Sequence, residues 1–428
     1  MTTTNERKGV PSGRPSLFSV DEALARLLDG VAPTGRVDLV PTGDGWGRVL
    51  ASDVVSAVDV PPEDNSAMDG YALRVADLLG RDDTVLPISQ RIVAGRPGHP
   101  LQPGTVARIF TGAQIPPGAD AVVMQENCEA LPEGPGGGQV RVRLQPEPGT
   151  AIRRRGEDVC AGSVVLRAGR RLDAAAVGLA ATTGAATLHV APRPRVALFS
   201  TGDELVMPGE PLPPGAIYNS NRYMLAALLR GCGCQVDDLG NVPDRLEATR
   251  EMLRRAAADH DLILSSGGVS VGEEDHLKPA LAAEGHLDLW SIAIKPGKPL
   301  AFGHVRRGSG APGEATPFLG LPGNPVSGFV TFVLFVRPVV LRLQGAHAPA
   351  ARLVALRADF DWPRPDPRRR EFLRVRRNDA GGLDLYPNQG SGVLTSVAWA
   401  DGLVDLAPGQ AVARGDLVRF LGLAELAP

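Results

Sequence analysis

The feature that most constrains the fold is a region after Pro194 in which short apolar segments alternate with amphipathic ones. The strand-like segments are 195–200, 234–239, 262–264 and parts of 287–303, and the helix-like segments are 221–231, 243–258, 277–284 and a last one opened by Asn324-Pro325. Strands that alternate with helices form a parallel, doubly wound sheet with helices on both faces. The sequence therefore predicts a central α/β domain in this region.

Capping signals predict where several helices begin. Ser19 and Glu22 form a capping-box pattern ahead of a leucine face that ends at Gly30. In the α/β region, Asn221 and Asp244 stand where two helices are expected to start. We therefore expect both of these side chains to act as N-caps.

The segments on either side of the α/β region are β-like. Residues 85–147 are short apolar or alternating runs divided by Pro and Gly, which predicts a small barrel or sandwich. The same pattern of short β-like segments follows Gln344 and predicts a second small barrel. An alanine-rich helix is expected near 174–181. Residues 1–15 are polar and predicted to be disordered. The expected fold class is α/β plus β, with several domains in 428 residues.

Composition argues against several classes of function. The formal net charge of -3 gives no basic footprint for nucleic acid, so local charges must hold any anionic ligand. The four cysteines lack zinc-knuckle spacing and are expected to be buried thiols in a reducing cytosol. No signal peptide is expected in MTTTNERKGVPSGRP. Arg337 and Pro338 interrupt the apolar run 329–341, which favours a buried helix over a membrane span.

Four polar loops follow strand-like segments of the α/β region, where open sheets of this kind bind ligands. They are Ser200–Glu204, Ser265–Asp275, Lys295–Pro299 and Leu321–Ser327. In the third, KPGKP, prolines stiffen a loop with two lysines, which suits a small oxyanion or phosphate; a solvated surface turn is the structural alternative. In the fourth, Asn324 is expected to cap a helix with Pro325 at its first position. That helix N-terminus and the Ser327 hydroxyl could face an anion, or the cap could be purely structural.

The stretch LILSSGGVSVGEED places carboxylates beside a glycine loop. Ser265, Ser266, Gly267 and Gly268 can hold a phosphate through their backbone N–H groups, while Asp275 ends the loop with a carboxylate. A Mg²⁺ ion allows carboxylates and a phosphate to lie side by side, because it binds one or two carboxylates together with substrate phosphates and waters. We therefore expect a phosphoanhydride on the serine–glycine segment and a metal ion on Asp275.

Further acidic residues in loops are Asp69, Asp158, Glu204 and Asp244. Three of these acids could instead have a purely structural role. Asp244 could cap a helix, Asp158 could pair with the arginines of 153–155, and Asp69 could be a turn residue before a glycine. The sequence contains no recognisable Ser–His–Asp or Cys–His set, and a general base among these acids cannot be assigned from it.

Taken in order, these motifs resemble those of the molybdopterin molybdenumtransferase (MoeA) family, which includes the E domain of gephyrin. The matching stretches are DVPPEDNSAMDGYA, IRRRGED, VALFSTGDEL, IYNSNR, SSGGVSVGEED, AIKPGKPLAFG, LGLPGNPVS and NQGSG, between residues 47 and about 395. Two departures from the family pattern are Glu63, where an apolar residue is usual, and His276, where an aromatic residue often follows the aspartate.

The resemblance implies insertion of molybdate into adenylylated molybdopterin with release of AMP, which gives molybdenum cofactor. It also implies Mg²⁺ as cofactor, a cytoplasmic homodimer with shared active sites, the upstream adenylyltransferase as a candidate partner, and no binding to nucleic acid or membrane. The dithiolene of the pterin supplies the sulfur ligands, so no cysteine nucleophile is required. The implied domains are a disordered tail (1–15), an elongated N-terminal region (16–60 and 148–192), an inserted β domain (61–147), the α/β molybdopterin-binding domain (193–345) and a C-terminal β-barrel domain (346–428).

Carried over position by position, the resemblance implies catalytic roles for Asp69, Asp158, Glu204, Asp244, Asp275, Lys295 and Lys298, with Glu204, Asp244 and Asp275 as metal ligands. The residues expected to bind substrate are Thr201, Gly202, Asn221, Ser265, Ser266, Gly267, Gly268, Pro322, Asn324, Pro325, Ser327, Arg374 and Ser391. Arg374 and Ser391 come from the resemblance alone and would add a charge and a hydroxyl group to an oxyanion site.

Two other functions stay open as alternatives. Molybdopterin adenylyltransferase resembles the α/β domain alone, so the two β domains and the N-terminal region argue against it. A gephyrin-like scaffold is the non-enzymatic alternative; the absence of a long linker and of a second α/β domain before Ser19 argues against that function. The sequence does not distinguish molybdate from tungstate as the preferred oxyanion.

Overall fold

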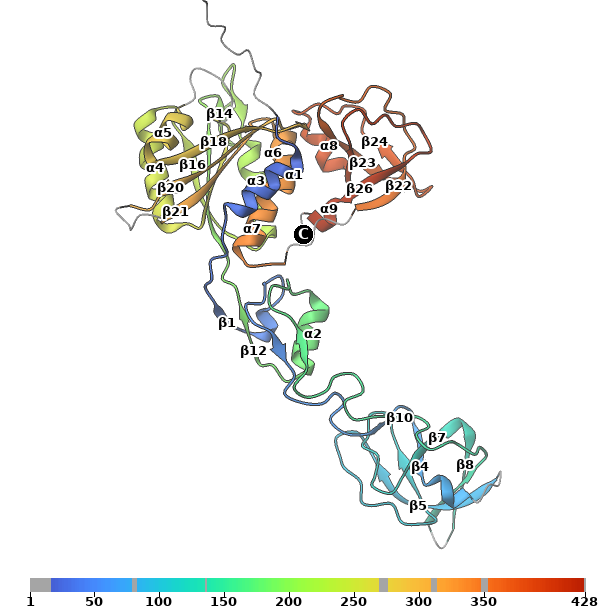
Figure 1. Ribbon diagram of the computed structural model, residues 1–428. Helices are drawn as coiled ribbons and strands as arrows, with labels where there is room; N and C mark the ends of the chain where they lie inside the picture. Colours follow the sequence, from blue (N-terminus) through green and yellow to red (C-terminus); the bar gives the residue numbers. More distant parts are fainter. Residues whose placement is uncertain are drawn as a thin grey trace, which may run out of the picture. The chain divides into compact units, whose positions relative to one another are not determined.

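The computed structural model describes residues 17–78, 83–134, 137–268, 276–308, 314–347 and 353–426. The chain divides into two compact units (Figure 1). The first unit comprises Met1–Asp38, Gly47–Ala51 and Ala191–Pro428, and the second comprises Leu39–Trp46 and Ser52–Val190. The predicted α/β region and the C-terminal β region therefore belong to one unit, and the N-terminal β region belongs to the other.

A six-stranded sheet with strand order β16-β13-β17-β21-β20-β18 forms the centre of the first unit. The strands are β13 (Arg195–Thr201), β16 (Gln235–Val242), β17 (Leu262–Ser266), β18 (Gly285–Ser291), β20 (Pro299–Arg306) and β21 (Ala315–Leu321). Strands β16, β13, β17 and β21 pair in parallel, as predicted, but β20 is antiparallel to both of its neighbours. The reversal follows from chain length, because residues 307–314 are too few for the crossover that a parallel pair requires.

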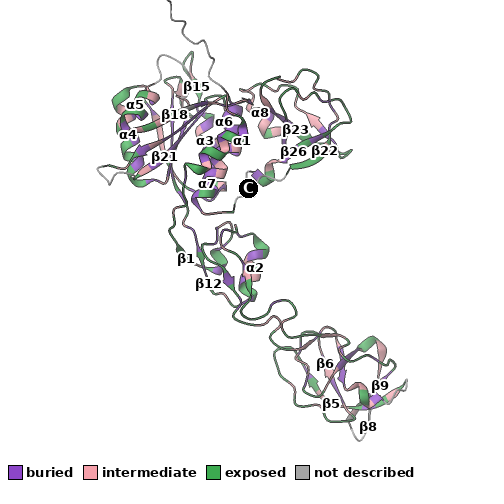
Figure 2. Cartoon of the chain, in the orientation of Figure 1, coloured by how far each residue is buried: buried purple, intermediate pink, exposed green. Residues whose placement is uncertain are grey.

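Helices cover both faces of this sheet, which confirms the doubly wound α/β class (Figures 1 and 2). One face carries α4 (Leu246–Asp259) and α5 (Leu277–Glu284), and the other carries α1 (Val20–Asp29), α3 (Ser220–Gly231), α6 (Pro325–Thr331), the π-helical turn η4 (Phe332–Val336) and α7 (Arg337–Leu343). The continuous helix Pro325–Leu343 is long and apolar enough to cross a membrane, but 78% of it is buried inside the protein. The expectation of a buried helix is therefore confirmed.

The predicted helix starts were partly right. Ser19 Oγ accepts a hydrogen bond from the Glu22 amide at 3.1 Å and Glu22 accepts one from the Ser19 amide at 2.9 Å, so the capping box of α1 is present. Asn221, however, does not cap α3, because the helix begins earlier and Asn219 accepts from the backbone N–H three residues on. Asp244 does not cap α4, which begins two residues later without any side-chain cap.

The C-terminal part of the first unit is a second sheet with strand order β19-β23-β25-β26-β22, and β24 lies beside β23. Its elements are β19 (Ile294–Lys295), β22 (Leu353–Arg357), β23 (Arg370–Arg377), β24 (Leu383–Leu385), α8 (Leu394–Trp399), β25 (Gly402–Leu406), β26 (Leu417–Gly422) and α9 (Leu423–Leu426). Strand β19 comes from the KPGKP region and pairs in parallel with β23. Phe372, Leu403 and Leu421 also join the core beneath α3 and α6. One hydrophobic cluster therefore spans the two parts, and the C-terminal sheet has a second cluster of its own.

The second unit contains a six-stranded sheet with strand order β7-β4-β6-β5-β9-β8 and three short ladders, β1-β12, β2-β11 and β3-β10. Its strands are β1 (Asp38–Pro41), β2 (Val54–Val55), β3 (Asn65–Ser66), β4 (Gly70–Leu73), β5 (Thr84–Ile92), β6 (Val106–Ile109), β7 (Ala121–Met124), β8 (Cys128–Gly134), β9 (Gly137–Val142), β10 (Ile152–Arg153), β11 (Val164–Leu166) and β12 (Thr187–Val190). Its helices are η1 (Thr42–Asp44), η2 (Val75–Leu78), η3 (Gln125–Asn127) and α2 (Ala174–Thr182).

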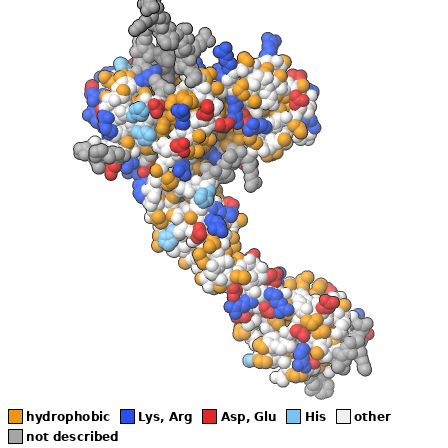
Figure 3. Space-filling model, viewed as in Figure 1, with side chains coloured by type: hydrophobic (Ala, Val, Ile, Leu, Met, Phe, Trp, Pro, Cys, Tyr) orange, Lys and Arg blue, Asp and Glu red, His pale blue; other side chains and the backbone are white. Residues whose placement is uncertain are grey.

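On the face shown in Figure 3, acidic and basic side chains are interspersed, in keeping with the small net charge.

Candidate active site

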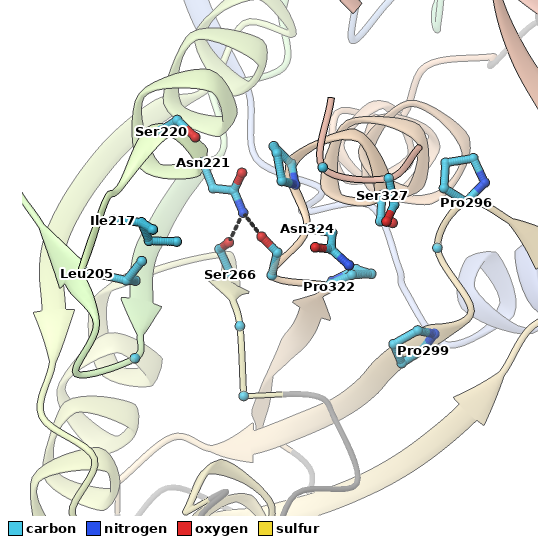
Figure 4. Close-up of a pocket in the computed structure, with 18 of the residues that line it drawn as sticks. Leu205, Ile217, Ser220, Asn221, Ser266, Pro296, Pro299, Pro322, Asn324 and Ser327 are labelled. Atoms are coloured by element: carbon cyan, nitrogen blue, oxygen red, sulfur yellow. Dashed lines mark hydrogen bonds between the residues drawn. The ribbon is translucent and has the colours of Figure 1, made fainter. Parts of the chain in front are cut away.

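The carboxyl ends of the parallel strands open into a cavity of about 1120 Å³ in the first unit (Figure 4). All four loops singled out in the sequence contribute residues to its lining, and residues 389–392 of the C-terminal part complete it. A doubly wound sheet binds its ligands at this edge, so the cavity is the candidate active site.

Most of the predicted site residues line this cavity. They are Thr201, Gly202, Glu204, Asn221, Asp244, Ser266, Gly267, Gly268, Lys295, Lys298, Pro322, Asn324, Pro325, Ser327 and Ser391. Asp275 lies outside the described residues, and Asp69 and Asp158 belong to the second unit. Ser265 and Arg374 are not part of the lining.

The serine–glycine loop turns tightly against strand β13. Gly267 and Gly268 have φ of 91° and 68°, and a Cβ on Gly267 would lie 2.7 Å from the Thr201 carbonyl oxygen. Only glycine avoids both strains, so the loop backbone can approach a ligand closely. Ser265 is fully buried and points away from the cavity, because successive strand residues face opposite sides of a sheet. Ser266 lines the cavity, whereas Ser265 does not, contrary to its predicted place in the site.

Asn221 links two of the loops instead of capping a helix. Its Nδ2 donates to Ser266 Oγ at 2.9 Å and to the Gly323 carbonyl at 2.7 Å, as the dashed lines in Figure 4 show. Its Oδ1 is buried without a hydrogen-bond partner among the described residues, as is Nδ2 of the neighbouring Asn219. Buried polar atoms without partners are costly, so these atoms are suited to a polar ligand.

The cations of the cavity come from two parts of the first unit. Lys298 is exposed and forms no ion pair within the described part of the chain, whereas Lys295 lies 2.8 Å from a carboxylate oxygen of Glu371. Arg369 also lines the cavity, and its Nε donates to Asp366 at 2.7 Å. The sequence analysis missed Arg369, and the available signal was the arginine run 368–370, whose last residue begins strand β23.

Arg374 lies beneath the cavity instead of in its wall. The side chain is 1% exposed and donates to Ser396 Oγ at 3.1 Å, to the Phe372 carbonyl at 3.1 Å and to the Gly390 carbonyl at 3.2 Å. Burial lowers the pKa of this guanidinium to about 10. The neighbouring Ser391 carbonyl accepts a hydrogen bond from the Val326 amide at 2.9 Å. Arg374 therefore supports the 389–392 loop, which corrects its predicted role as a direct ligand of the oxyanion.

The start of helix α6 follows the predicted pattern only in part. Asn324 occupies the N-cap position and Pro325 the first helical position, but the Asn324 side chain makes no capping hydrogen bond. The Ser391 carbonyl of the C-terminal part accepts a hydrogen bond from the backbone N–H of Val326, the second residue of the helix, instead. The Asn324 side chain therefore lies in the cavity wall without a local capping role.

Two carboxylates, Glu204 and Asp244, line the same cavity. Within the described ranges no three His, Cys, Asp or Glu residues gather closely enough to bind a metal ion by themselves. Mg²⁺ does not require such a cluster, because it takes one or two protein carboxylates and completes its shell with phosphates and waters. The donor set is thus suitable for Mg²⁺ in the presence of a phosphate ligand.

The two acids of the second unit differ in their surroundings. Asp69 Oδ1 accepts hydrogen bonds from the Thr111 amide at 2.7 Å and from the Thr111 hydroxyl at 2.8 Å, and these bonds hold the pKa of Asp69 below its ordinary value. Asp158 is exposed. No ion pair joins it to Arg153, Arg154 or Arg155, all three of which lie within the described residues; Arg154 and Arg155 pair with Asp64 and Asp59 instead. The ion-pair alternative for Asp158 is therefore wrong.

Apolar side chains line the side of the cavity away from Pro296 and Pro299 of the KPGKP loop (Figure 4). Leu205 and the pair Ile217 and Tyr218 come from the short parallel strands β14 (Leu205–Val206) and β15 (Ile217–Tyr218). The Tyr218 hydroxyl donates to the Glu210 carbonyl at 3.0 Å, which fixes the ring at the edge of the cavity. A cavity with apolar groups on one side and cations on the other suits a ligand with a flat ring and a charged end.

The fold and the cavity place the chain in the class of molybdopterin-binding proteins, since residues 197–342 match the model of the "Probable molybdopterin binding domain". The chain belongs to the MoeA, or molybdopterin molybdenumtransferase, family: residues 18–184 match the "MoeA N-terminal region (domain I and II)" and residues 355–423 the "MoeA C-terminal region (domain IV)". The resemblance seen in the motifs is confirmed.

Relatives of known name agree with this assignment. The chain is 40% identical to the molybdopterin molybdenumtransferase of Haemophilus influenzae over 77% of this chain and 78% of that protein. It is 40% identical to molybdopterin molybdenumtransferase 2 of Mycobacterium tuberculosis over 86% of this chain and 90% of the relative. The crystal structure of the molybdopterin biosynthesis moeA protein from Pyrococcus horikoshii OT3 superposes with a TM-score of 0.80 at 29% identity, covering 95% of this chain and 100% of that one.

Proposed function

We propose that the chain transfers molybdenum from molybdate to adenylylated molybdopterin and releases AMP. The observation that carries the proposal is the single cavity that combines an apolar wall, a tight glycine loop and a group of cations at the edge of a doubly wound sheet. Membership of the MoeA family, whose relatives carry the corresponding name, supports it.

Different groups in the cavity wall suit different parts of the two substrates. The backbone N–H of Gly268 suits a phosphate of the anhydride, whereas that of Gly267 already donates to the Leu321 carbonyl at 3.0 Å; the wall of Ile217 and Tyr218 suits a flat ring. Molybdate is a tetrahedral dianion, for which lysine and arginine groups and hydroxyl donors provide charge-assisted hydrogen bonds. The residues that provide them are Lys295, Lys298, Arg369, Ser327 and Ser391.

We also propose that Mg²⁺ binds at Glu204 and Asp244, with Asp275 as a further ligand. When bound, the ion neutralises charge on the anhydride, which favours attack on phosphorus and departure of AMP. Glu204 and Asp244, which line the same cavity as the glycine loop, would hold the ion.

The further proposals are a homodimer with shared sites and a cytoplasmic location. All four cysteines are free, which agrees with a reducing compartment. Only Cys232 and Cys234 are buried, so the expectation of buried thiols is wrong for the exposed Cys160 and the half-buried Cys128. Asp69 and Asp158 belong to the second unit, and the cavity belongs to the first.

The test is release of AMP from adenylylated molybdopterin by the purified chain, with and without molybdate. Molybdate-dependent release is expected, and parallel reactions with tungstate measure the oxyanion preference. Net adenylylation of molybdopterin from ATP would instead identify an adenylyltransferase. A polymeric complex without any cofactor production would identify a scaffold.

A further inference from the structure

A buried carboxylate, Glu371, adjoins the cavity and has no part in the proposed chemistry. Its side chain is 1% exposed, and it lies on β23 directly opposite Lys295 of the paired strand β19. A buried carboxylate is costly unless hydrogen bonds and an opposite charge compensate it. The groups that surround Glu371 therefore indicate its role.

Both oxygens of Glu371 have partners, and the two sets of partners differ. Oε1 forms the ion pair with the Lys295 ammonium at 2.8 Å and accepts no hydrogen bond from the described residues. Oε2 accepts from Trp362 Nε1 at 3.0 Å and from the Asp366 amide at 2.9 Å. One oxygen thus holds a cavity lysine, and the other fixes the turn that begins at Asp366.

That turn carries the second cation. Asp366 Oδ1 accepts from the amides of Arg368 and Arg369 at 3.0 Å, and Oδ2 accepts from Arg369 Nε at 2.7 Å. Arg369 lines the cavity from this turn. Glu371 therefore contacts Lys295 directly and Arg369 through Asp366, whereas Lys298 makes no ion pair with it or with any other described residue.

We propose that Glu371 is a positioning residue that holds Lys295, and through the Asp366 turn Arg369, at the oxyanion end of the cavity. A free lysine side chain has many rotamers, and fixing it before the ligand arrives reduces the entropy lost on binding. The oxyanion part of this inference rests on the proposed function, whereas the fixed position of Lys295 does not.

Glu371→Gln isolates the contact with Lys295. The amide oxygen can still accept from Trp362 and Asp366, and the amide NH₂ then faces the lysine, which it cannot hold. Asp405→Asn is the matched control, because Asp405 is also 1% exposed and binds Arg370, which does not line the cavity.

The first measurement is the mobility of the lysine side chains by NMR in the full chain without ligand. Lysine occurs only at positions 8, 278, 295 and 298, so side-chain labelling gives few signals. Lys295 is expected to be ordered and Lys298 mobile in the wild type, and Glu371→Gln is expected to make Lys295 as mobile as Lys298, while Asp405→Asn leaves it ordered. Equal order of Lys295 in the wild type and in Glu371→Gln would overturn the proposal.

The second measurement is the affinity for molybdate by calorimetric titration. Lys295→Ala is expected to weaken binding by about tenfold in the wild type and by less than about twofold in Glu371→Gln, because the lysine no longer has a fixed place there. Lys298→Ala is expected to weaken binding equally in both backgrounds. An equal effect of Lys295→Ala in both would contradict the proposal. Absence of molybdate binding by the wild type would reject the proposed oxyanion site, while the NMR result would still decide the position of Lys295.

Discussion

At the residue scale, the two lysines of KPGKP look equivalent in the sequence but have different surroundings. Lys298 is exposed and unpaired within the described part of the chain, whereas Lys295 is bound to a buried carboxylate. We predict that Lys298→Ala removes one charge-assisted contact with molybdate, worth roughly 1.5–3 kcal/mol. The molybdate concentration for half-maximal AMP release should rise by roughly 10- to 100-fold.

The fold should survive this change, because the replaced side chain is exposed. Arg255→Ala, an exposed cation of α4 outside the cavity lining, is the control and should change neither the molybdate requirement nor the melting temperature. If Lys298→Ala kept both the wild-type molybdate requirement and the wild-type turnover, the KPGKP loop would be a structural turn.

The arginines of the C-terminal part show where sequence reasoning fails at this scale. The resemblance pointed to Arg374, yet that guanidinium lies beneath the 389–392 loop, and Arg369 reaches the cavity. Both lie in one arginine-rich segment, and their roles differ because one is inside a strand with a buried pattern and the other is on the turn before it. Sequence spacing identifies the loops of this site, but it does not show which neighbouring side chain is buried.

At the element scale, the loop after β17 depends on glycine. A methyl group at Gly267 would meet the Thr201 carbonyl oxygen at 2.7 Å, and the residue has a φ of 91°. We predict that Gly267→Ala lowers the free energy of unfolding by roughly 1–3 kcal/mol and lowers activity, because the loop must move away from β13. Thermal unfolding and AMP release of the same preparation measure the two effects.

Gly178→Ala is the matched control for this prediction. Gly178 lies in helix α2 with an open space at its Cβ position, and its φ is not in the left-handed region. Alanine there should raise the free energy of unfolding by about 0.5–1 kcal/mol and leave activity unchanged. A Gly267→Ala protein as stable and active as the wild type would show that the loop tolerates a different path.

Asp359 ties the end of β22 to the turn after β23. Its carboxylate accepts from Arg357 Nε at 2.9 Å and from Asn378 Nδ2 at 2.8 Å. These bonds, with that to Arg357 the stronger, lower the pKa of Asp359 from 3.8 to about 2. A carboxyl group with a lowered folded-state pKa contributes stability above its unfolded pKa, and this contribution disappears as the pH falls through the folded value.

We therefore predict that Asp359→Asn melts at a lower temperature than the wild type at neutral pH. The gap in melting temperature should narrow as the pH falls from 3.8 to about 2, the interval between the two pKa values. Asp379→Asn, at an exposed neighbouring residue whose side chain forms no hydrogen bond with the described residues, is the control and should show no such gap. A gap for Asp359→Asn that is constant over the whole pH range would rule out this linkage.

The presence and order of the helices and strands were easier to predict than the residue at which each helix begins. The alternation of apolar and amphipathic segments fixed the order of strands and helices in the α/β region, because hydrophobic periodicity follows directly from burial. Capping was less predictable, because several polar residues stand near each helix start. Asn219 caps α3, and Asn221, two residues on, turns its amide into the cavity wall. Only the tertiary contacts with Ser266 and Gly323 separate these two roles.

At the scale of the whole molecule, the candidate acids are distributed over two units. Asp69 belongs to the second unit, whereas Glu204, Asp244 and the cations of the cavity belong to the first. A sequence shows this separation only as distance along the chain, and it does not show which copy of the chain supplies each acid. The division of the chain into β and α/β regions was predictable from composition and spacing. Whether a single chain holds a complete site was not predictable.

A mixed dimer tests whether two chains share their sites. In a two-fold dimer with shared sites, one Asp69→Asn subunit and one Asp275→Asn subunit give one site with both lesions and one site with neither. The heterodimer, co-expressed with two tags and purified, should then recover about half of the wild-type AMP release, while each parent dimer is nearly inactive. If each chain holds a complete site, every site in the heterodimer carries one lesion and no activity returns. A wild-type chain that sediments as a monomer and is fully active would exclude sharing altogether.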